Sequence, residues 1–517
     1  MGAFLSRARI TAPPGFDRWL VPPCALAVHL CIGMAYGFSV FWLPLSRALA
    51  APACSSLSSA LTSTSCDWRV SDLVWVYTLF FVVLGLAAAV WGGWVERVGP
   101  RRAGLTAAAC WSGGIALGAL GVFLHQLWLF WLGAGVLGGI GLGIGYITPV
   151  STLIKWFPDR RGLATGMAIM GFGGGAMVGS PAADRLMAAF ASPEGGGGVW
   201  QAMLVLAGVY ALFMAAGAVG FRLPAPGWAP PGKAEIVAGG RFVPMGIAVR
   251  TPQFWLVWCV LLFNVSASIG IIGLASPMVQ EIFGGGLFGE AVRFADFNVD
   301  QKAAAAAAGA GFVGLISLFN IAGRFFWASL SDRIGRKAMY AAILALGAVC
   351  YGAALPTGPA LPLFVAVFAL VASMYGGGFA AVPAWLADLF GTKQVGAIHG
   401  RLLTAWSTAG VLGPLLVAYV RDARLTAGAA RETVYGPIFL MLAGLLALGL
   451  VAALQVRPVL ADKWVDDEDA APALAVATAA PAARPAWGPR FAAWATVLVP
   501  LAWGGWFTVQ KAAILLS

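Results

Sequence analysis

The stretch AAAAAAGAGFVGLISLFNIAGRFFWASL, residues 303–330, is an apolar run of helix length whose one charged residue is Arg324. Because about 20 apolar residues are enough to cross the hydrocarbon core of a bilayer, the run predicts a membrane-spanning helix. An ionised side chain in such a helix costs roughly 2.5–3.5 kcal/mol on insertion scales and generally faces a partner or a water-filled cavity. A cation that faces a cavity suits an anionic solute, so the stretch indicates a membrane path for small anions.

The composition of the whole chain agrees with this interpretation. Of its 517 residues, 60% are hydrophobic and 10% are charged, whereas a soluble protein carries about 25% charged residues. These values are typical of membrane proteins built from many helices. We expect twelve spans and a weaker thirteenth at 491–509; the twelve are 20–43, 72–94, 104–124, 127–150, 162–188, 200–221, 252–280, 303–330, 338–357, 361–386, 395–420 and 434–454.

The net charge of +11 does not indicate a nucleic-acid partner. The basic residues concentrate in the N-terminal segment, in the loops that follow even-numbered spans, and in the tail after residue 455. This is the positive-inside pattern, which anionic lipid headgroups explain. We therefore expect a multi-pass protein of a bacterial inner membrane, with a cytoplasmic N-terminus, an uncleaved first helix and no bound nucleic acid.

Two of the seven cysteines, Cys54 and Cys66, fall in the first predicted outer loop. That side of the membrane is oxidising in a bacterium, so a disulfide between them and two free thiols are both open. The other cysteines fall within spans and predict small apolar packing. No cluster of His and Cys has metal-ligand spacing, so we expect no metal ion and no cofactor.

The two halves of the chain echo each other. The segment ERVGPRR (96–102), after the second span, matches DRIGRK (332–337), after the eighth. Gly162-x-x-x-Gly166, which opens the fifth span, matches Gly396-x-x-x-Gly400, which opens the eleventh. The two matches have nearly the same offset, which indicates an internal repeat.

The repeat sets the expected organisation. It predicts a six-helix bundle at 1–221, a cytoplasmic linker at 222–251 and a second six-helix bundle at 252–454. An acidic and then Ala/Pro-rich stretch at 455–490 predicts a flexible tether. The apolar segment 491–517 either spans the membrane or lies at its interface, and we favour a span.

Parallel six-helix repeats about an axis along the membrane normal are the arrangement of the major facilitator superfamily, and the short acid-Arg-x-Gly loop resembles its signature. The resemblance implies that the acid of the first loop contacts the start of the eleventh helix. Glu96 is then expected to pair with Arg401, and by pseudo-symmetry Asp332 with Arg161. Such gating pairs would stabilise an outward-open state. The predicted gating residues also include Arg97 and Arg333, the arginines of the two loops. The alternative is an ordinary turn anchored by headgroup-facing charges.

Three further motifs resemble the oxalate/formate antiporter family: KWFPDRRGLATG (155–166), DLFGTK (388–393) leading into GAIHG (396–400), and NIAGR (320–324). The resemblance implies that Arg324 binds the carboxylate of the substrate. The chemistry agrees, because a guanidinium stays protonated and grips a carboxylate through two parallel hydrogen bonds. The alternative is that Arg324 snorkels to the inner interface.

The chain departs from the family at Trp406, where oxalate-exchanging members carry a lysine after the step that here reads Thr404-Ala405. Two fixed cations suit a dianion and one suits a monoanion, because an unmatched carboxylate is costly to desolvate. A monocarboxylate such as formate, pyruvate or lactate is therefore favoured over oxalate.

A second departure concerns proton coupling. Related monocarboxylate transporters place an aspartate one turn before the arginine, where this chain has Asn320, an amide that carries no proton. His29 is titratable, although packing is the commoner role of a lone membrane histidine. Exchange or facilitated passage is favoured over proton symport.

Several polar aromatic residues are candidates for the lining of a substrate cavity. Tyr36, Tyr146 and Tyr375 would orient a carboxylate through their hydroxyls, together with Asn320 and Trp406. Aromatic packing is the alternative.

We thus predict an all-α major facilitator fold that moves a small carboxylate by alternating access, as a monomer. The open alternatives are a proton-linked monocarboxylate symporter, an efflux pump for amphipathic compounds, and a transporter-like sensor or assembly partner. We do not expect an enzyme, since the sequence offers no nucleophile–base pair.

Overall fold

The computed structural model describes residues 7–45, 48–49, 51–190, 198–226, 228–230, 241–272, 275–289, 292–293, 296–354, 361–466 and 487–512. The regular structure of these residues is helical, apart from two short strands that pair antiparallel, β1 (Arg241–Phe242) and β2 (Val465–Asp466). The predicted all-α fold is confirmed.

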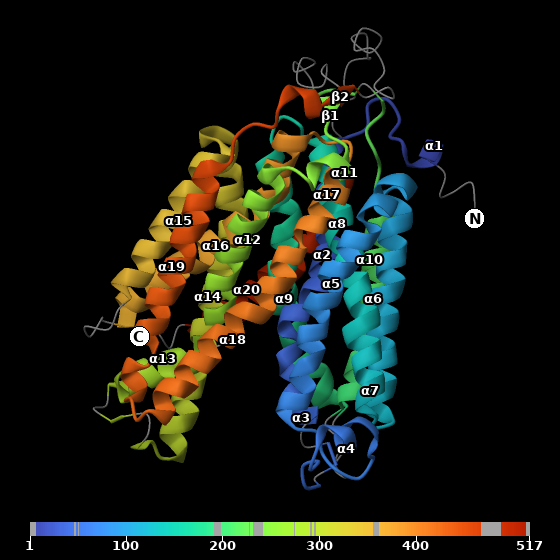
Figure 1. The fold of residues 1–517 in the computed structure, drawn as a ribbon. Coiled ribbons are helices and arrows are strands. Elements are labelled where there is room, and N and C mark those ends of the chain that lie inside the picture. Colours follow the sequence, from blue (N-terminus) through green and yellow to red (C-terminus); the bar gives the residue numbers. More distant parts are fainter. Residues whose placement is uncertain are drawn as a thin grey trace. The chain divides into compact units, whose positions relative to one another are not determined.

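Each of the six spans predicted in the first half is helical (Figure 1). The helices are α2 (Val21–Ile32) with η2 (Gly33–Phe41), α5 (Val70–Val98), α6 (Pro100–Phe123), α7 (Leu127–Phe130) with η3 (Trp131–Gly138) and α8 (Gly139–Trp156), α9 (Arg161–Ala189) and α10 (Val199–Gly220).

The described residues of the six spans of the second half are mainly helical as well, and a further helix follows them. They are α12 (Pro252–Ile272) and α13 (Ala275–Phe283), α14 (Val299–Ile334), α15 (Arg336–Ala353), α16 (Leu361–Phe390), α17 (Val395–Leu402) with α18 (Thr404–Thr426), α19 (Tyr435–Gln455), and finally α20 (Trp487–Ala512). The predicted tether is described only as far as residue 466 and from residue 487 on.

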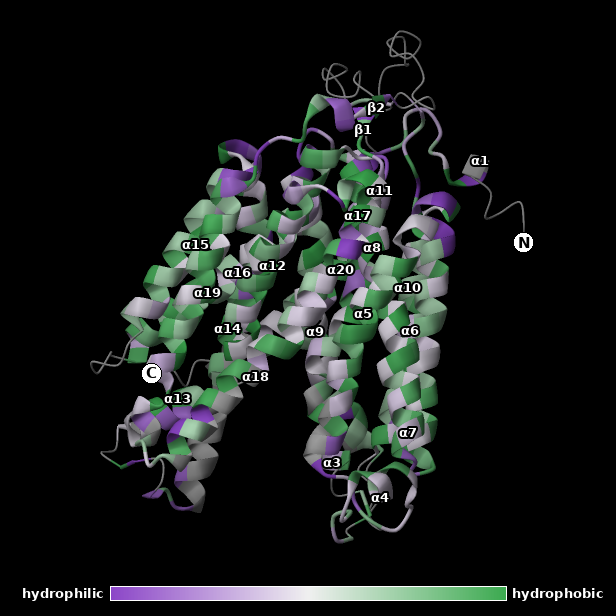
Figure 2. Cartoon of the chain, in the orientation of Figure 1, coloured by the Kyte–Doolittle hydropathy of each residue, from purple (hydrophilic) through white to green (hydrophobic). Residues whose placement is uncertain are grey.

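Short elements complete the chain: α1 (Arg7–Ile10), η1 (Arg18–Leu20), α3 (Trp42–Leu45), α4 (Leu57–Thr62), α11 (Met245–Ala248), η5 (Gly284–Phe288), η7 (Arg431–Thr433) and η8 (Ala461–Lys463). Within the described ranges, nine helices are long and apolar enough to cross a membrane. Figure 2 shows hydrophobic residues along the helices, with hydrophilic residues gathered mainly near their ends.

The described residues pack into two compact units. Unit 1 comprises Met1–Thr251, Pro383–Ser407 and Val459–Leu501, and unit 2 comprises Pro252–Val382, Thr408–Pro458 and Ala502–Ser517. Residues 383–407, which belong to the second half of the sequence, therefore pack with the first half.

In unit 1, α2 packs on α9 and α10, α6 packs on α8 and α10, and α5 packs on α8 and α17. Figure 1 shows α6 and α10 side by side. Small residues permit the close approach of α5 and α17: a Cβ at Gly92 would lie 2.9 Å from the Cα of Ala397, and one at Gly400 would meet the backbone of Ala88. Trp111, Tyr146 and Trp406 are fully buried in this unit.

In unit 2, α19 packs on α12 and α15, and α14 packs on α13 and α15. The packing of α14 against α16 depends on glycine, because a Cβ at Gly323 would collide with the backbone of Ser373, and one at Gly376 would collide with that of Asn320.

The two repeated loops have the same backbone conformation. Gly99, between α5 and α6, has φ 82°, and Gly335, between α14 and α15, has φ 86°. Side chains other than glycine rarely adopt positive φ, so this residue permits each helix to end and the next to begin within one residue.

Cys54 and Cys66 form a disulfide, with their Cα atoms 5.0 Å apart. It closes the segment that contains α4, between the first and second spans.

Candidate transport site and its contacts

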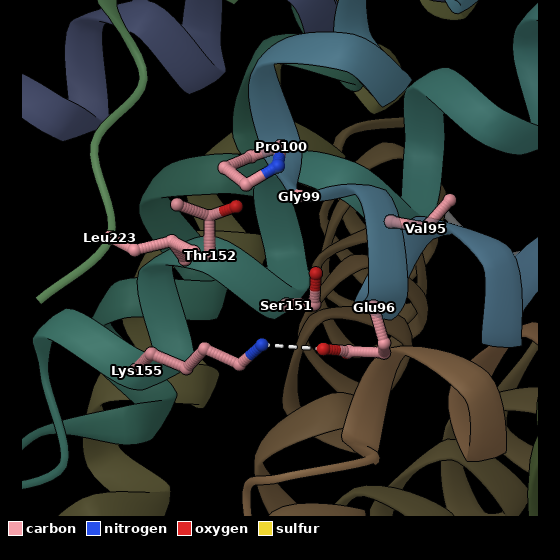
Figure 3. A pocket seen from close by; sticks show the side chains of 8 residues that line it. All are labelled: Val95, Glu96, Gly99, Pro100, Ser151, Thr152, Lys155 and Leu223. Carbon is pink, nitrogen blue, oxygen red and sulfur yellow. Dashed lines mark hydrogen bonds and ion pairs between the residues drawn. The ribbon is translucent and has the colours of Figure 1, made fainter. Parts of the chain in front are cut away.

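Glu96, the acid of the first repeated loop, joins three elements of unit 1. Its Oε1 accepts a hydrogen bond from the backbone N–H of Gly396 at 3.0 Å, and its Oε2 lies 2.5 Å from Nζ of Lys155. Figure 3 shows the ion pair beside Ser151, in a small pocket lined also by Thr152. Gly396 is the second residue of α17, so the carboxylate meets a helix N-terminus, where the orphan N–H groups and the helix dipole favour negative charge.

The contact with the start of the eleventh helix is thus present, but Arg401 does not provide it, and that part of the prediction is wrong. Arg401 lies further along α17, and its Nη1 donates to the carbonyl of Ala397 on its own helix at 3.2 Å. The backbone N–H of Gly396 and Lys155 occupy the positions beside the carboxylate instead.

The second predicted gating pair is also different from the expectation. Arg161 pairs with Asp388 at 2.5 Å, and Asp332 pairs with Arg336, one turn further on, also at 2.5 Å. Asp388 lies near the end of α16, so the Arg161 pair joins the start of the fifth span to the end of the tenth. The side chains of Arg97 and Arg333 are exposed.

A fourth ion pair connects the start of the first helix to the loop before α9. Arg18 contacts Asp159 through two parallel hydrogen bonds, Nη1–Oδ1 at 2.7 Å and Nη2–Oδ2 at 3.2 Å. Burial raises the pKa of the Asp159 carboxyl. The hydrogen bond and the charge of Arg18 lower this pKa, and the backbone N–H of Asp159 and the charge of Arg160 add smaller decreases. The decreases together exceed the increase, so the pKa of Asp159 is lower than usual. The pair stabilises the charged carboxylate.

Arg324 is fully buried, in unit 2. Its Nε donates to Oδ1 of Asn320 at 3.0 Å, and its Cζ lies 5.7 Å from the ring centroid of Phe379 on α16. Nδ2 of Asn320 donates in turn to the carbonyl of Ala372 at 3.0 Å, which fixes the amide. A guanidinium that snorkels to headgroups would be exposed at the protein surface, so the structure disfavours that alternative.

Tyr375 belongs to the same group. Its side chain is buried, and its ring centroid lies 6.4 Å from that of Phe379, the ring below the Arg324 guanidinium. Of the predicted substrate residues, the structure therefore brings Arg324, Asn320 and Tyr375 together in unit 2.

The other three predicted substrate residues meet in unit 1. The ring of Trp406 lies 5.4 Å from Phe81, 5.4 Å from Tyr146, 5.5 Å from Phe172 and 6.5 Å from Tyr36, measured between centroids. We call these five residues the aromatic cluster. Phe81 and Phe172 were not predicted. The chain has 31 phenylalanines, and nothing in the sequence distinguishes these two from the rest.

Two histidines border the aromatic cluster. The ring of His29 stacks on Tyr146 at 5.2 Å, and the ring of His399 lies 5.9 Å from Tyr146. Both histidines are buried. Among the described residues, no group of three or more His, Cys, Asp or Glu is placed to hold a metal ion.

Sequence reasoning also missed a buried carboxylate in unit 2. Glu281 of α13 accepts from Nε of Arg421 at 3.1 Å and from the hydroxyl of Tyr435 at 2.6 Å. These contacts fix α13 to α18 and to the start of α19. The two partners lie far from Glu281 in the sequence, and no motif connects them.

The helices are those of a multi-pass membrane protein, and comparison with known proteins gives the family. The chain matches the Major Facilitator Superfamily over residues 24–295 and 292–515, and it belongs to that superfamily. It is therefore a multi-pass membrane protein and a secondary transporter, not an enzyme.

Three relatives show where in the superfamily the chain lies. It is 26% identical to the uncharacterized transporter YhjX of Escherichia coli, over 74% of this chain and 83% of that one. It is 30% identical to the oxalate:formate antiporter of Oxalobacter formigenes, over 54% of this chain and 59% of the antiporter. It is 25% identical to apicoplast pyruvate carrier 1 of Toxoplasma gondii, over 72% of this chain and 78% of the carrier. The resemblance to the oxalate/formate antiporter family is confirmed at this level.

A solved structure supports the fold. The fucose:proton symporter FucP of Escherichia coli is 13% identical and superimposes with a TM-score of 0.58, over 86% of this chain and 100% of that one. At this identity the likeness concerns the fold alone.

Proposed function

We propose that the protein carries a small monocarboxylate, such as formate, pyruvate or lactate, across a bacterial inner membrane, with exchange of one anion for another as its main mode. The proposal depends chiefly on Arg324, a cation enclosed within the protein toward the end of the eighth predicted span. Asn320 and Phe379, two uncharged side chains, contact its guanidinium. The relatives named for oxalate, formate and pyruvate support a small carboxylate as the ligand.

In this proposal the predicted halves, 1–221 and 252–454, alternate between two states. The Glu96–Gly396 and Arg161–Asp388 contacts close one side of the path, because each joins the first half to the 383–407 segment of the second half. Binding of the carboxylate at Arg324 neutralises the buried charge, which lowers the cost of enclosing the site during the alternation.

Flux in proteoliposomes tests the proposal. Labelled formate, pyruvate, lactate and oxalate are offered outside, with and without the same anion inside. We expect the three monocarboxylates to enter faster than oxalate, and an internal anion to accelerate entry. Flux that does not respond to the internal anion would exclude exchange, and preferential oxalate flux would exclude the monocarboxylate assignment.

Two variants separate charge from geometry at the site. Truncating one member of a buried charged pair costs about 2–5 kcal/mol, so Arg324→Gln is expected to lower uptake at limiting substrate by roughly 30-fold or more. Arg324→Lys keeps the charge and loses the two parallel hydrogen bonds, and should lie between Gln and the wild type. Arg424→Gln, at an exposed arginine of α18, is the control. Normal flux in Arg324→Gln would refute this site.

A further inference from the structure

The linker predicted between the two halves is bound to the turn that joins α16 to α17. The backbone N–H of Val243 donates to the carbonyl oxygen of Phe390, the last residue of α16, at 2.8 Å. The N–H of Met245 donates to Oε1 of Gln394, the N-cap residue of α17, at 2.7 Å. Figure 1 shows α11, which begins at Met245, beside α17. The linker therefore holds both ends of this turn.

The contact between linker and turn is close and largely buried. Val243 is fully buried and Phe242 is 8% exposed. Gly391 has φ 81°, and a Cβ there would lie 2.8 Å from the carbonyl oxygen of Arg241 and 2.9 Å from the Cα of Phe242. Glycine thus provides both the backbone conformation and the space that the contact needs. Nζ of Lys393 lies 4.9 Å from the ring centroid of Phe242, within the range of a cation–π interaction.

The C-terminal tail pairs with the linker as well, but more weakly. The two strands β1 and β2 have two residues each, and a two-stranded sheet is marginally stable by itself. Nε of Arg241 lies 3.3 Å from Oδ1 of Asp466, and the two side chains are 49% and 88% exposed. An ion pair of this exposure contributes little. The buried linker residues 242–245, rather than the tail, therefore hold the turn.

The turn lies next to both contacts that, in the proposed function, close one side of the path. Gly396, two residues after Gln394, donates its backbone N–H to Oε1 of Glu96 at 3.0 Å. Asp388, near the end of α16, pairs with Arg161. Because Gln394 is the N-cap residue of α17, its position determines where the N–H of Gly396 points.

The segment 383–407 begins at a proline inside α16, and the boundary between the two compact units falls at the same residue. Pro383 has no N–H, so the helical hydrogen bond that would go to the carbonyl of Phe379 is not formed. A helix bends more easily at such a position. Contacts at the far end of the segment, where the linker binds, therefore have more influence on its orientation.

We propose that linker residues 242–245 form a latch on the turn between α16 and α17, and that the latch favours the state in which Gly396 contacts Glu96. This inference rests on the proposed function, in which one side of the path opens when residues 383–407 separate from the first half. While the latch holds, the N–H of Gly396 stays directed at the Glu96 carboxylate. When the latch is released, the turn loses the hydrogen bonds from Val243 and Met245, and the open state becomes more populated.

Labelling of Ser151→Cys with a maleimide reports the open state without any transport. Ser151 is buried beside Glu96, and a Cβ at Gly396 would lie 3.0 Å from its Cβ, so the reagent reaches position 151 only when α17 moves away. The background lacks the three partly exposed free cysteines and retains the two buried ones, Cys31 and Cys350. Mass spectrometry of peptides from the purified full chain gives the three rates separately, and reaction at Cys31 or Cys350 reports unfolding.

Gln394→Leu removes the acceptor of the Met245 N–H and leaves the backbone of the turn unchanged. It should raise the labelling rate at position 151 about fivefold, which corresponds to about 1 kcal/mol, the net contribution of one hydrogen bond. The rates at the two buried cysteines should not change. Gln253→Leu is the matched control, at a glutamine of α12 whose Nε2 donates to the carbonyl of Pro458 and not to the turn. It should label as the parent does.

A second variant tests the other hydrogen bond and does not depend on Gln394. Val243→Pro removes the N–H that donates to Phe390, at a position that already precedes a proline and is therefore biased toward an extended backbone. It should also raise the labelling rate about fivefold. Val243→Ala retains the N–H and is the control for the lost side-chain volume, so it should label more slowly than Val243→Pro.

The outcomes distinguish the latch from the proposed function. Labelling at position 151 that is as slow in Gln394→Leu and Val243→Pro as in the parent would overturn the latch, whatever the protein transports. Labelling that accelerates equally at position 151 and at the two buried cysteines would overturn it too, because the linker would then support only the fold. If the wild-type protein carries no carboxylate, the proposed function fails, and the labelling rates still decide whether the linker holds the turn.

Discussion

Trp406 shows how much one side chain determines at a site of this kind. The resemblance to the oxalate/formate antiporter family led us to expect a lysine at this position. Four aromatic rings surround Trp406 within 6.5 Å. Aromatic faces stabilise a cation by about 0.5–2 kcal/mol, so the aromatic cluster is suited to accept an ammonium group in place of the indole.

We therefore expect Trp406→Lys to shift selectivity toward a dianion. A second fixed cation compensates the second carboxylate of oxalate, and a gain of about 1.4 kcal/mol corresponds to tenfold in the oxalate-to-formate ratio. Competition between labelled formate and unlabelled oxalate measures the ratio. Trp406→Met removes the ring without adding charge and should leave the ratio unchanged; an unchanged ratio in Trp406→Lys would contradict the charge argument.

Asp159 carries a prediction about acid stability. Its pKa is lowered in the folded protein, so the charged carboxylate stabilises the fold. A lowered pKa contributes stability that is complete above the unfolded value of about 3.9 and is lost as the pH falls through the folded value. We expect Asp159→Asn to lower the Tm at pH 7, by roughly 2–4 °C for each kcal/mol by which the free energy of unfolding decreases.

The difference between Asp159→Asn and the wild type should shrink as the pH approaches 3, where the wild-type carboxyl is protonated too. Thermal unfolding followed by tryptophan fluorescence at a series of pH values measures this. Arg160→Gln is the matched control, because Arg160 is exposed and its Nε lies 4.0 Å from Asp159. A constant difference from pH 7 to pH 3 would contradict the assignment.

At the level of residues, the sequence predicted the polar side chains of the candidate site but not the residues from other helices that contact them. Asn320 and Arg324 are four apart on one helix, so their contact follows from helix geometry alone. Phe379 contacts Arg324 only because two glycines, Gly323 and Gly376, let α14 and α16 approach closely. A close approach between distant helices leaves no periodic trace in the sequence.

At the level of elements, the open question about α20 is whether this helix is packed against the rest of the transporter. On the unit 1 side its Val497 is buried against Leu26 and Ala27, and its Leu501 lies at Gly174. Arg490 forms an ion pair with Asp17. These contacts indicate a helix that is docked on α2 and α9, and we propose that it is a permanent part of the transporter rather than a free tail.

We expect Val497→Ala to lower the Tm, because it leaves a cavity between α20 and α2, and deletion of buried methyl groups costs about 0.5–1.5 kcal/mol in comparable cases. Val499→Ala is the matched control two residues away, at a side chain that is 65% exposed. Unfolding followed with a thiol-reactive dye measures both, in a background without the partly exposed Cys24, Cys110 and Cys259, since Cys31 and Cys350 are buried in the folded chain. Equal Tm values for the two variants would refute the docking.

Hydropathy predicted which segments form membrane-spanning helices, but it did not predict the breaks and irregular turns within them or where they begin. It reports that a segment is apolar, and therefore gave 395–420 as one span, where the structure has α17, Leu403 and α18. The π-helical turn η3 inside the fourth span is likewise invisible to it. Hydropathy also places the start of α14 near residue 303, whereas Asn298 caps it, with its side chain accepting from the N–H of Gln301.

For the whole molecule, the internal repeat correctly predicted matching backbone conformations in the two halves, but it did not predict which residues form ion pairs. Gly99 and Gly335 adopt the same positive φ, as the repeat predicts. Pseudo-symmetry paired Asp332 with Arg161, yet Arg161 pairs with Asp388. The repeat fixes where helices turn, but the two halves have diverged in the charges that they present, so partner identities depend on packing that the sequence does not reveal.

The Arg161–Asp388 pair gives the last prediction, about the two states of the transporter. If the pair holds residues 383–407 against the first half in one state, breaking it favours the other state. An ion pair of this exposure is worth about 1 kcal/mol, which changes the ratio of the two states about fivefold. The charge reversals Arg161→Asp and Asp388→Arg should each have this effect, and the double reversal should restore the wild-type ratio.

Labelling of a cysteine at position 151 measures the ratio, in a background without Cys24, Cys31, Cys110, Cys259 and Cys350. Ser151 is buried beside Glu96 and near Gly396, so a maleimide reaches it only when the 383–407 segment separates from the first half. Each single reversal should raise the labelling rate about fivefold, and the double reversal should return it to that of the parent. Arg424→Gln, at an exposed residue of α18, should leave it unchanged. If the double reversal labels as fast as the singles, the two charges act separately and the pair does not hold the segment closed.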